Sequence, residues 1–205
     1  MSLDQATASG RRTAEIRRET KETTIEVALD VDGTGRSDIA TGIGFLDHML
    51  DALARHSRFD LTVRATGDLH IDAHHTAEDI AIVLGQALDR ALGDKKGLRR
   101  FADAVCPLDE ALSQVVLDFS GRGFAAIDLP FKGERIGTLP TEMIEHFLYS
   151  FAIEGRLTLH VRLLSGVNDH HRAEATFKAL ARCLEMATRI DPRIATQVPS
   201  TKGSL

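Results

Sequence analysis

The residues in this sequence with the clearest capacity for chemistry are histidines and glutamates in a pattern that occurs twice. The pattern His-His-x-x-Glu occupies positions 74–78 and 170–174. If each copy lies on a helix, its first histidine and its glutamate, at i and i+4, share one face. The second histidine is rotated by about 100° and must reach a different partner. The doubled pattern therefore predicts metal ligands that point in two directions. These ligands are His74, His75, Glu78, His170, His171 and Glu174.

Two further histidines, His48 and His146, precede the two patterns at matching positions. With them the set holds six histidines and two glutamates, or three nitrogens and one carboxylate for each of two ions. The set has no thiolate, so structural zinc is not favoured, whereas imidazole with carboxylate suits Mn, Fe, Co or Zn. Octahedral coordination would leave two positions open for substrate or water, as Lewis-acid catalysis requires. We interpret His56 and His160 as ordinary surface or core residues, and the role of His70 stays open.

The ligand pattern is part of an internal duplication, because several segments recur in the same order. The offset between matching segments is 88 near the start, then 98, and 96 after a loop that is two residues shorter in the second copy. Collinear matches with consistent gaps indicate two copies of one ancestral half, and convergent amphipathic patterning is the alternative. The matching pairs are 29–35 with 117–123, 45–50 with 143–148, 61–64 with 159–162, and 74–78 with 170–174.

Each half is expected to contain an alternating strand, a glycine-rich turn, a helix, a second strand and a long closing helix. This order predicts an α+β fold made of two pseudo-symmetric halves, each a sheet covered on one face by helices. The boundary between the halves is expected between Gly97 and Pro107. The expected strands are Thr24–Asp30, Phe59–Ala65, Gln114–Phe119 and Arg156–Leu163. The expected units are a loose tail at 1–10, the halves at 11–100 and 101–192, and a C-terminal tail at 193–205.

The composition of the chain limits which partners it can bind and in which cellular compartment it is expected. A net charge of −5 and a pI near 6.0 argue against nucleic acid as the main partner. No apolar stretch approaches the roughly 20 residues that span a membrane, and residues 1–10 lack the apolar region of a signal peptide. The only cysteines, Cys106 and Cys183, form no disulfide framework, which fits a reducing cytoplasm.

Acidic and basic residues outside the ligand pattern give weaker signals. Glu22 and Glu110 correspond at the offset of 88, each before the first expected strand of its half, and their spacing alone favours exposed acids. Lys178 lies four residues after Glu174, which a helix salt bridge would explain. The C-terminal segment 199–203, with hydroxyls and a lysine, is similar to a loop that grips phosphate. The remaining basic candidates are Arg100 and Arg122.

Taken together, these motifs resemble the imidazoleglycerol-phosphate dehydratase family. The resemblance runs from about Arg17 to the last residue, with the motifs in the family's order. Ala73, Ala102 and Gly123 depart from the family's pattern, which puts only local loop shape in doubt because none is a ligand. The motifs are Gly-Phe-Leu-Asp-His-Met-Leu at 44–50, Arg-Ala-Thr-Gly-Asp-Leu-His-Ile-Asp at 64–72, His-His-Thr-Ala-Glu-Asp-Ile at 74–80, Pro-Leu-Asp-Glu-Ala-Leu at 107–112, Phe-Lys-Ala at 177–179 and Pro-Ser-Thr-Lys-Gly at 199–203.

The resemblance implies a fold of the ribosomal protein S5 domain 2-like type and removal of water from imidazoleglycerol phosphate, giving imidazole acetol phosphate, in histidine biosynthesis. It implies two Mn(II) ions per active site and trimers assembled into a homo-oligomer of about two dozen subunits, with sites between subunits. Glu22 would be the acid–base residue. The implied metal ligands are His48, His74, His75, Glu78, His146, His170, His171 and Glu174. The implied substrate contacts are Arg100, Arg122, Lys178, Ser200 and Lys202.

Two other functions use the same residues. A dimetal hydrolase of a small phosphorylated substrate would use the ions to activate water. A metal-storage protein would use the histidines without a substrate. Clustering of Arg100, Arg122 and Lys202 favours an anionic substrate over storage.

Overall fold

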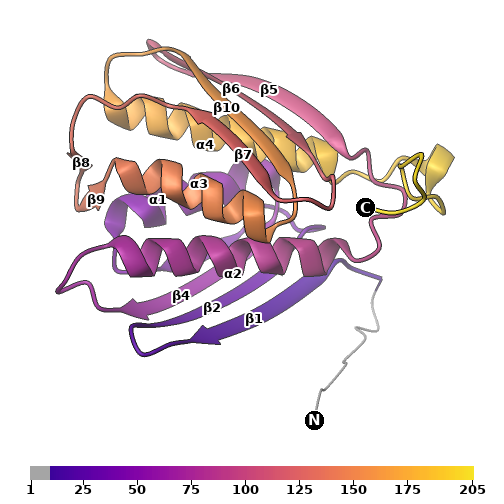
Figure 1. The fold of residues 1–205 in the computed structure, drawn as a ribbon, viewed down its shortest axis with the longest axis horizontal. Coiled ribbons are helices and arrows are strands. Elements are labelled where there is room, and N and C mark those ends of the chain that lie inside the picture. The colour runs from indigo at the N-terminus through magenta and orange to yellow at the C-terminus, as the bar shows by residue number, and fades with distance from the viewer. Residues whose placement is uncertain (1–9) are drawn as a thin grey trace.

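The computed structural model describes residues 10–205, so the tail expected at 1–10 lies outside the described residues except for Gly10. Two four-stranded sheets and four long helices form the molecule (Figure 1). The first half consists of β1 (Thr13–Glu19), β2 (Thr23–Asp30), β3 (Ser37–Ala40), α1 (Gly44–Ser57), β4 (Asp60–Gly67) and α2 (His74–Leu92). The second half consists of β5 (Phe101–Leu108), β6 (Ala111–Asp118), β7 (Phe124–Asp128), α3 (Glu142–Glu154), β10 (Thr158–Ser165) and α4 (Asp169–Ala187). A small hairpin of β8 (Arg135–Ile136) and β9 (Leu139–Pro140) precedes α3, and a short 3-10 helix (Pro192–Ile194) follows α4.

The two halves have the same topology, which confirms the predicted duplication. The strand orders are β1-β2-β4-β3 and β5-β6-β10-β7. In each sheet the last pair, β3 with β4 or β7 with β10, is parallel and the other pairs are antiparallel. The helices α1 and α2 cover one face of the first sheet, and α3 and α4 cover one face of the second. The predicted α+β fold, with helices on one face of each sheet, is therefore correct.

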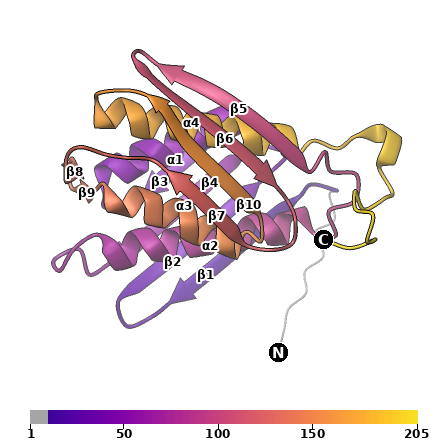
Figure 2. The same ribbon diagram turned by 45° about the horizontal axis from the view of Figure 1, so that its top comes forward.

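The halves join through their helices, so the molecule is a stack of sheet, helices, helices and sheet (Figures 1 and 2). Helix α2 packs against α3, and α1 packs against α4. The α2–α3 approach is close because a Cβ at Gly85 would lie 2.7 Å from the Phe151 carbonyl oxygen. The core fills the middle of the stack and includes the fully buried Phe147 and Phe177. Among residues 10–205, none of the helices combines the length and the apolar composition needed to cross a lipid bilayer.

The sequence-based expectations were wrong at the sheet edges. Strands β1, β3, β5 and β7 were not predicted. Pro107, expected in the linker between the halves, lies inside β5. An edge strand tolerates proline because one side of its backbone has no partner strand. Glu22 and Glu110 therefore do not precede the first strand of their halves, but lie in the β1–β2 and β5–β6 turns.

Candidate functional site

Three predicted ligands from α2 and α3 come together in a first cluster. His146 Nε2 lies 3.0 Å from Glu78 Oε1. His74 Nε2 lies 3.8 Å from Glu78 Oε2. His74 and Glu78 share a face of α2 as their spacing predicts, and the α2–α3 packing brings in His146 from the other half. The cluster is thus built from both halves of the chain.

A second cluster repeats the arrangement with α4 and α1. His48 Nε2 and His170 Nε2 lie 3.0 and 3.1 Å from the same oxygen, Glu174 Oε2. His48 belongs to α1 of the first half, whereas His170 and Glu174 belong to α4 of the second. Burial alone would raise the pKa of Glu174, but hydrogen bonds from Lys178 and His48 lower it to about 2. The carboxylate is therefore charged at neutral pH.

The donor sets of both clusters fit a divalent transition-metal ion. Within each cluster the three candidate ligand atoms all lie within 4.8 Å of one another. Neighbouring ligands of an octahedral ion with bonds of about 2.1 Å lie about 3 Å apart, as the Glu174 contacts do. Two imidazoles and a carboxylate suit Mn, Fe, Co or Zn and leave positions for further ligands.

Local structure places both histidine pairs in the first turn of a helix. Asn168 caps α4, and its Oδ1 accepts hydrogen bonds from the backbone N–H groups of His170 and His171. At the corresponding point before α2, Asp72 Oδ1 accepts from the His74 N–H at 2.8 Å. These bonds satisfy N–H groups that the helix itself leaves without partners, and they fix where each pair begins.

The second histidine of each pair lies outside the clusters. The His75 ring is turned 80° from that of His74, and the His171 ring 88° from that of His170. His75 Nδ1 lies 2.9 Å from Asp68 Oδ2, and this hydrogen bond raises the pKa of His75. His171 Nδ1 makes a 2.7 Å hydrogen bond with a different acid, which raises its pKa in the same way. The pattern therefore supplies imidazoles in two directions, as expected.

The acid beside His171 is Glu110, and it is fully engaged. Its Oε2 faces His171 Nδ1, while its Oε1 accepts from the backbone N–H groups of Val167 and Asn168 at 3.0 and 2.8 Å. The His171 hydrogen bond, followed by those from the two backbone N–H groups, lowers the pKa of Glu110 to about 2. Glu110 is thus a fixed anion rather than a mobile acid.

Glu22 occupies the equivalent turn but its carboxylate is open. The side chain is 56% exposed, and Oε2 lies 3.9 Å from His75 Nδ1, beyond hydrogen-bonding distance. The turn itself is held by Thr20 Oγ1, which accepts from the backbone N–H groups of Glu22 and Thr23. Thr23 in turn donates its hydroxyl to Asp79 of α2, next to the predicted ligand Glu78. Among residues 10–205, the carboxylate of Glu22 therefore has no hydrogen-bond partner and lies near His75, the histidine outside the first cluster.

Two acids in this region, Asp68 and Asp79, were missed as site residues. Asp79 is almost fully buried and also accepts from Arg18 Nε at 2.9 Å, so it ties β1 and the Glu22 turn to α2. Both acids stand inside the motifs quoted above, at 64–72 and 74–80. Their positions in those motifs were the only available signal, since neither has metal-ligand spacing.

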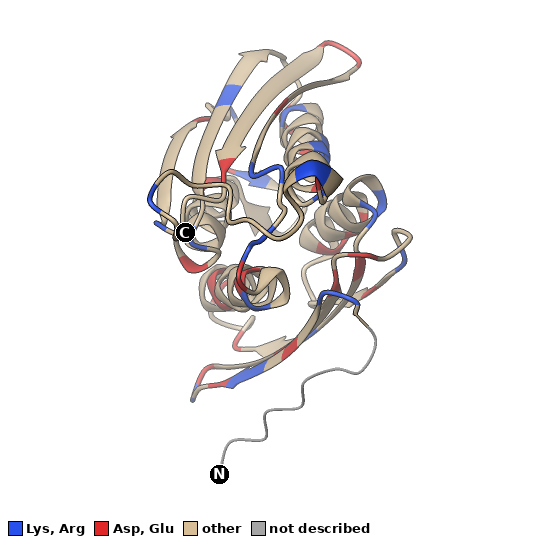
Figure 3. Ribbon diagram, turned by 90° about the vertical axis from the view of Figure 1, so that its right-hand side faces the viewer, with Lys and Arg blue, Asp and Glu red and all other residues tan. Residues whose placement is uncertain are grey.

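The basic candidates gather elsewhere. Arg100 donates to both oxygens of Asp118 at 2.7 and 3.1 Å and to the Pro199 carbonyl at 2.7 Å. The C-terminal segment with Ser200 and Lys202 thus lies against Arg100, and its last residue packs on Gly121, next to Arg122. Figure 3 looks onto this end of the molecule, with the C-terminus in front.

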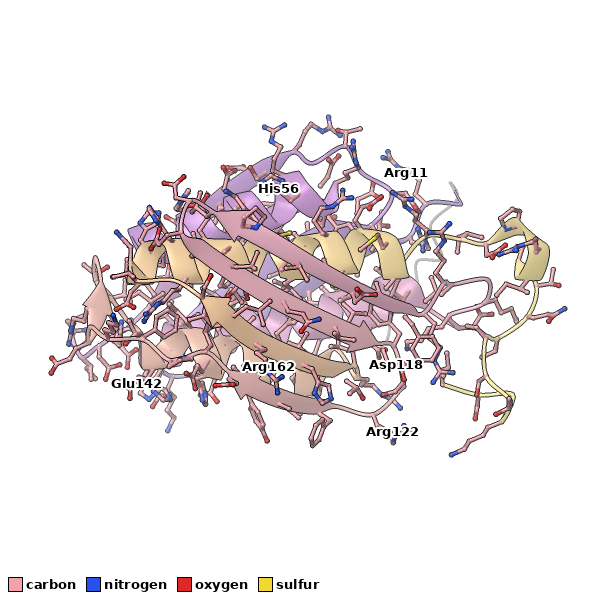
Figure 4. All side chains as sticks on the ribbon, turned by 90° about the horizontal axis from the view of Figure 1, so that it is seen from above. Arg11, His56, Asp118, Arg122, Glu142 and Arg162 are labelled. Atoms are coloured by element: carbon pink, nitrogen blue, oxygen red, sulfur yellow. The ribbon has the colours of Figure 1, made fainter. Side chains whose placement is uncertain are left out.

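This basic end lies far from the metal-ligand clusters within one chain. The backbone N–H of Arg100 donates to Ala187 at the end of α4. Glu174 stands 13 residues earlier on α4, which is about 20 Å at 1.5 Å per residue. Figure 4 shows Asp118 and Arg122 at one end and Glu142, the first residue of α3, at the other. Lys178 does not join the basic end, because its Nζ pairs with Glu174 at 2.7 Å.

The sequence and fold of this chain are similar to those of several known proteins. A family model described as imidazoleglycerol-phosphate dehydratase matches residues 41–184. The imidazoleglycerol-phosphate dehydratase of Granulibacter bethesdensis is 58% identical over 194 residues, which cover 95% of this chain and 99% of that protein. The crystal structure of the Staphylococcus aureus enzyme of that name has a TM-score of 0.79 at 37% identity and covers 87% of this chain and 99% of its own. A ligand complex of IGPD from Pyrococcus furiosus has a TM-score of 0.80 at 38% identity and covers 93% and 100%. The chain therefore belongs to the imidazoleglycerol-phosphate dehydratase family.

Proposed function

We propose that this chain removes water from imidazoleglycerol phosphate to give imidazole acetol phosphate, a step of histidine biosynthesis. The observation that carries the proposal is the pair of equivalent clusters, each of two histidines and one glutamate, in a chain whose relatives bear this enzyme's name. An imidazole ring offers two nitrogens, and two ions held by two clusters match that number.

The clusters would hold one Mn(II) ion each. When bound, the two ions would supply Lewis-acid stabilisation of negative charge on the imidazole ring of the substrate. His146 and Glu78 with His74 would hold one ion, and the ligands of the second cluster would hold the other. Each cluster offers three ligands, so the remaining implied ligands, His75 and His171, would complete the ions of neighbouring copies.

Glu22 would move the protons of the reaction. Hydroxide leaves the carbon attached to the ring, and a proton leaves the next carbon, which no carbonyl group acidifies. A carboxylate without hydrogen-bond partners can take that proton and return one when the resulting enol becomes the ketone. Glu22 has such a carboxylate, whereas both oxygens of its counterpart Glu110 are engaged.

The complete site would require two copies of the chain. Three carbons join the ring to the phosphate, and at about 1.5 Å per bond they span less than about 10 Å. That is too short to reach from a chain's own clusters to its own basic end, about 20 Å away along α4. The ring would bind at a metal-ligand cluster of one copy while Arg100, Arg122, Ser200 and Lys202 of a neighbour hold the phosphate. Lys178, which lies beside the second cluster, would contact substrate from the metal side.

Subunit mixing tests the shared site. Glu78→Ala disables the metal end and Arg122→Ala the phosphate end, so each variant alone should be almost inactive. After the two are dissociated and reassembled together, about a quarter of the sites receive two intact ends if two copies contribute at random. Return of activity on mixing supports the shared site, and activity no higher than that of the separate variants contradicts it.

The reaction itself is tested with the Mn-loaded protein. Incubation with imidazoleglycerol phosphate should produce imidazole acetol phosphate, detected as a ketone, with no release of inorganic phosphate. Phosphate release without the ketone would instead identify a dimetal hydrolase.

A further inference from the structure

The two histidines outside the clusters are each held by an acid through the same ring nitrogen. His75 Nδ1 lies 2.9 Å from Asp68, and His171 Nδ1 lies 2.7 Å from Glu110. Among residues 10–205, neither ring makes a hydrogen bond through Nε2; the nearest acid to that nitrogen of His171, Asp109, is 3.9 Å away. A neutral imidazole carries one N–H, and a carboxylate accepts it, so Nδ1 is the protonated nitrogen. The lone pair of each ring is then on Nε2.

The two acids come from different places in the duplicated structure. Asp68 begins the loop between β4 and α2 and is 12% exposed. In the second half this loop is two residues shorter, and the residues after β10 are Gly166, Val167 and Asn168, none of them acidic. No acid therefore stands where Asp68 does.

Glu110 reaches the same ring position from another element. It lies in the β5–β6 turn, at the position that corresponds to Glu22. The shortened loop helps to hold it, because the N–H groups of Val167 and Asn168 bind its Oε1 and direct its Oε2 to His171. The loop after β10, which has no acid equivalent to Asp68, thus fixes Glu110, the acid that contacts His171.

We propose that Asp68 and Glu110 are positioning residues that hold His75 and His171 with Nδ1 protonated and Nε2 available to a metal ion of a neighbouring copy. The part of this proposal that places the ion on a neighbouring copy rests on the proposed function. Carboxylates that bind the second nitrogen of a ligating histidine fix its orientation, and their loss commonly weakens metal binding 10–100-fold. In the first half, Asp68 performs this task, so Glu22 is left free for proton transfer.

The substitution Glu110→Gln tests the proposal without changing side-chain size. The backbone N–H groups of Val167 and Asn168 require an acceptor, so the amide oxygen takes the Oε1 position and the NH₂ faces His171. The amide then donates to Nδ1, the proton moves to Nε2, and the lone pair faces the wrong way. We expect Mn(II) titration to show one of the two ions per chain bound about 10–100-fold more weakly.

A tautomer measurement separates this effect from a general structural one. In metal-free protein labelled with ¹⁵N-histidine, at a pH where the rings are neutral, one ring should change from Nδ1–H to Nε2–H on Glu110→Gln. This readout does not need metal or substrate, so it stands even if the protein fails to make the ketone. A ring that keeps its Nδ1 proton, or undiminished affinity for both ions, would overturn the proposal.

The matched control is Glu22→Gln at the equivalent position. Glu22 makes no hydrogen bond to His75, so its replacement should leave both Mn(II) affinities and all ring tautomers unchanged. Equal loss of metal from the two variants would show a nonspecific effect of charge removal and would contradict the assignment. Circular dichroism and thermal unfolding establish that both variants are folded.

Discussion

Two corners of this molecule, the β1–β2 turn and the β5–β6 turn, occupy equivalent positions in the two halves and differ in chemistry. The β1–β2 turn presents Glu22 with an open carboxylate beside His75, whereas the β5–β6 turn presents Glu110 with both oxygens engaged. The strands that lead into the two corners correspond, since β1 pairs with β2 in the same register as β5 pairs with β6. The difference shows that a duplicated scaffold can keep two similar histidine–glutamate clusters while the acids at its two corners differ in their hydrogen bonding.

The way each turn is anchored explains the difference. In the first half, Asp79 holds the turn through Thr23 and Arg18. The equivalent residues in the second half are Ala175, Ala111 and Cys106, which cannot make these bonds. There the acid itself anchors the turn to the following loop. Glu22 is therefore free because other side chains hold its turn. The side chain of Glu110 instead helps to hold its own turn, together with Ser165, whose hydroxyl donates to the Glu110 backbone carbonyl.

The largest expected effect is on turnover. Glu22→Gln keeps the size and hydrogen-bonding ability of the side chain but removes its proton-accepting charge. If Glu22 moves protons, kcat should fall by roughly 10²-fold or more while metal content and substrate binding are retained. Steady-state kinetics with metal analysis measures both. Near-normal turnover would contradict the assignment of proton transfer to Glu22, and Glu110 would become the next candidate.

Metal removal tests a feature that the two corners share. Each corner has a histidine outside the clusters, His75 in the first half and His171 in the second. If His75 and His171 bind ions of other copies, ligation stabilises the contacts between subunits. Chelation should then lower the particle mass measured by light scattering to that of smaller oligomers. An unchanged mass after verified metal loss would show that neither histidine links copies.

A smaller effect, on metal affinity, is expected when Lys178 or its counterpart in the first half, Ile82, is replaced by the residue found at the other position. Glu174 is paired with Lys178 and 14% exposed, while Glu78 has no lysine one turn later and is 34% exposed. Lys178→Ile removes a positive charge beside the second cluster and should strengthen Mn(II) binding there by about 3–10-fold. The reciprocal Ile82→Lys should weaken the first site by a similar factor. Calorimetric titration in which both variants move the same way would contradict this electrostatic account.

The smallest effect concerns stability at the start of β4 and β10. Asp60 accepts from the N–H groups of Thr34 and Arg36 and pairs with the Arg36 side chain, while the equivalent Thr158 shares a neutral hydrogen bond with Ser120. The Arg36 hydrogen bond lowers the pKa of Asp60 below its usual value despite partial burial. Asp60 therefore stabilises the fold above the unfolded-state pKa of about 4, and this contribution is lost as the pH falls toward the folded-state pKa.

Asp60→Asn should accordingly lower Tm by about 2–4 °C at pH 7, with a difference from the unchanged protein that shrinks below about pH 4. Thr158→Val is the control, since it removes a neutral bond and should shift Tm equally at each pH. Thermal unfolding across this range measures both. A constant Asp60→Asn difference would show that the charge of Asp60 is not the source of its contribution.

Strong periodicity and repetition made the central elements predictable. The buried stripes of α1 and α2 and the alternation in β2 and β4 were read from residue spacing, and the repeat predicted their counterparts. The edge strands were missed because their patterns are weak. In β1, Arg17, Arg18 and Glu19 are charged, and in β5 the apolar Phe101 and Val105 face outward.

The membership of each cluster depended on packing that spacing does not encode. A separation of four residues predicts that His170 and Glu174 share a helix face, and they do. It does not predict that His48, 126 residues away, completes that cluster, because this follows from α1 packing on α4. The same holds for Glu110 and His171, which a turn and a shortened loop bring together.

The exchange of ligands between the halves has a consequence for the history of the chain. His48 completes the cluster on α4, and His146 completes the cluster on α2, so neither half can assemble a cluster from its own residues. The two contacts are related by the pseudo-twofold axis of the duplication. Two separate half-length chains would form both clusters only as a symmetric dimer with two identical sites. Such a dimer must carry the same acid at both corners in the same environment. In a single fused chain the two corners can differ. In this chain they do, because the carboxylate of Glu22 is open and both oxygens of Glu110 are engaged.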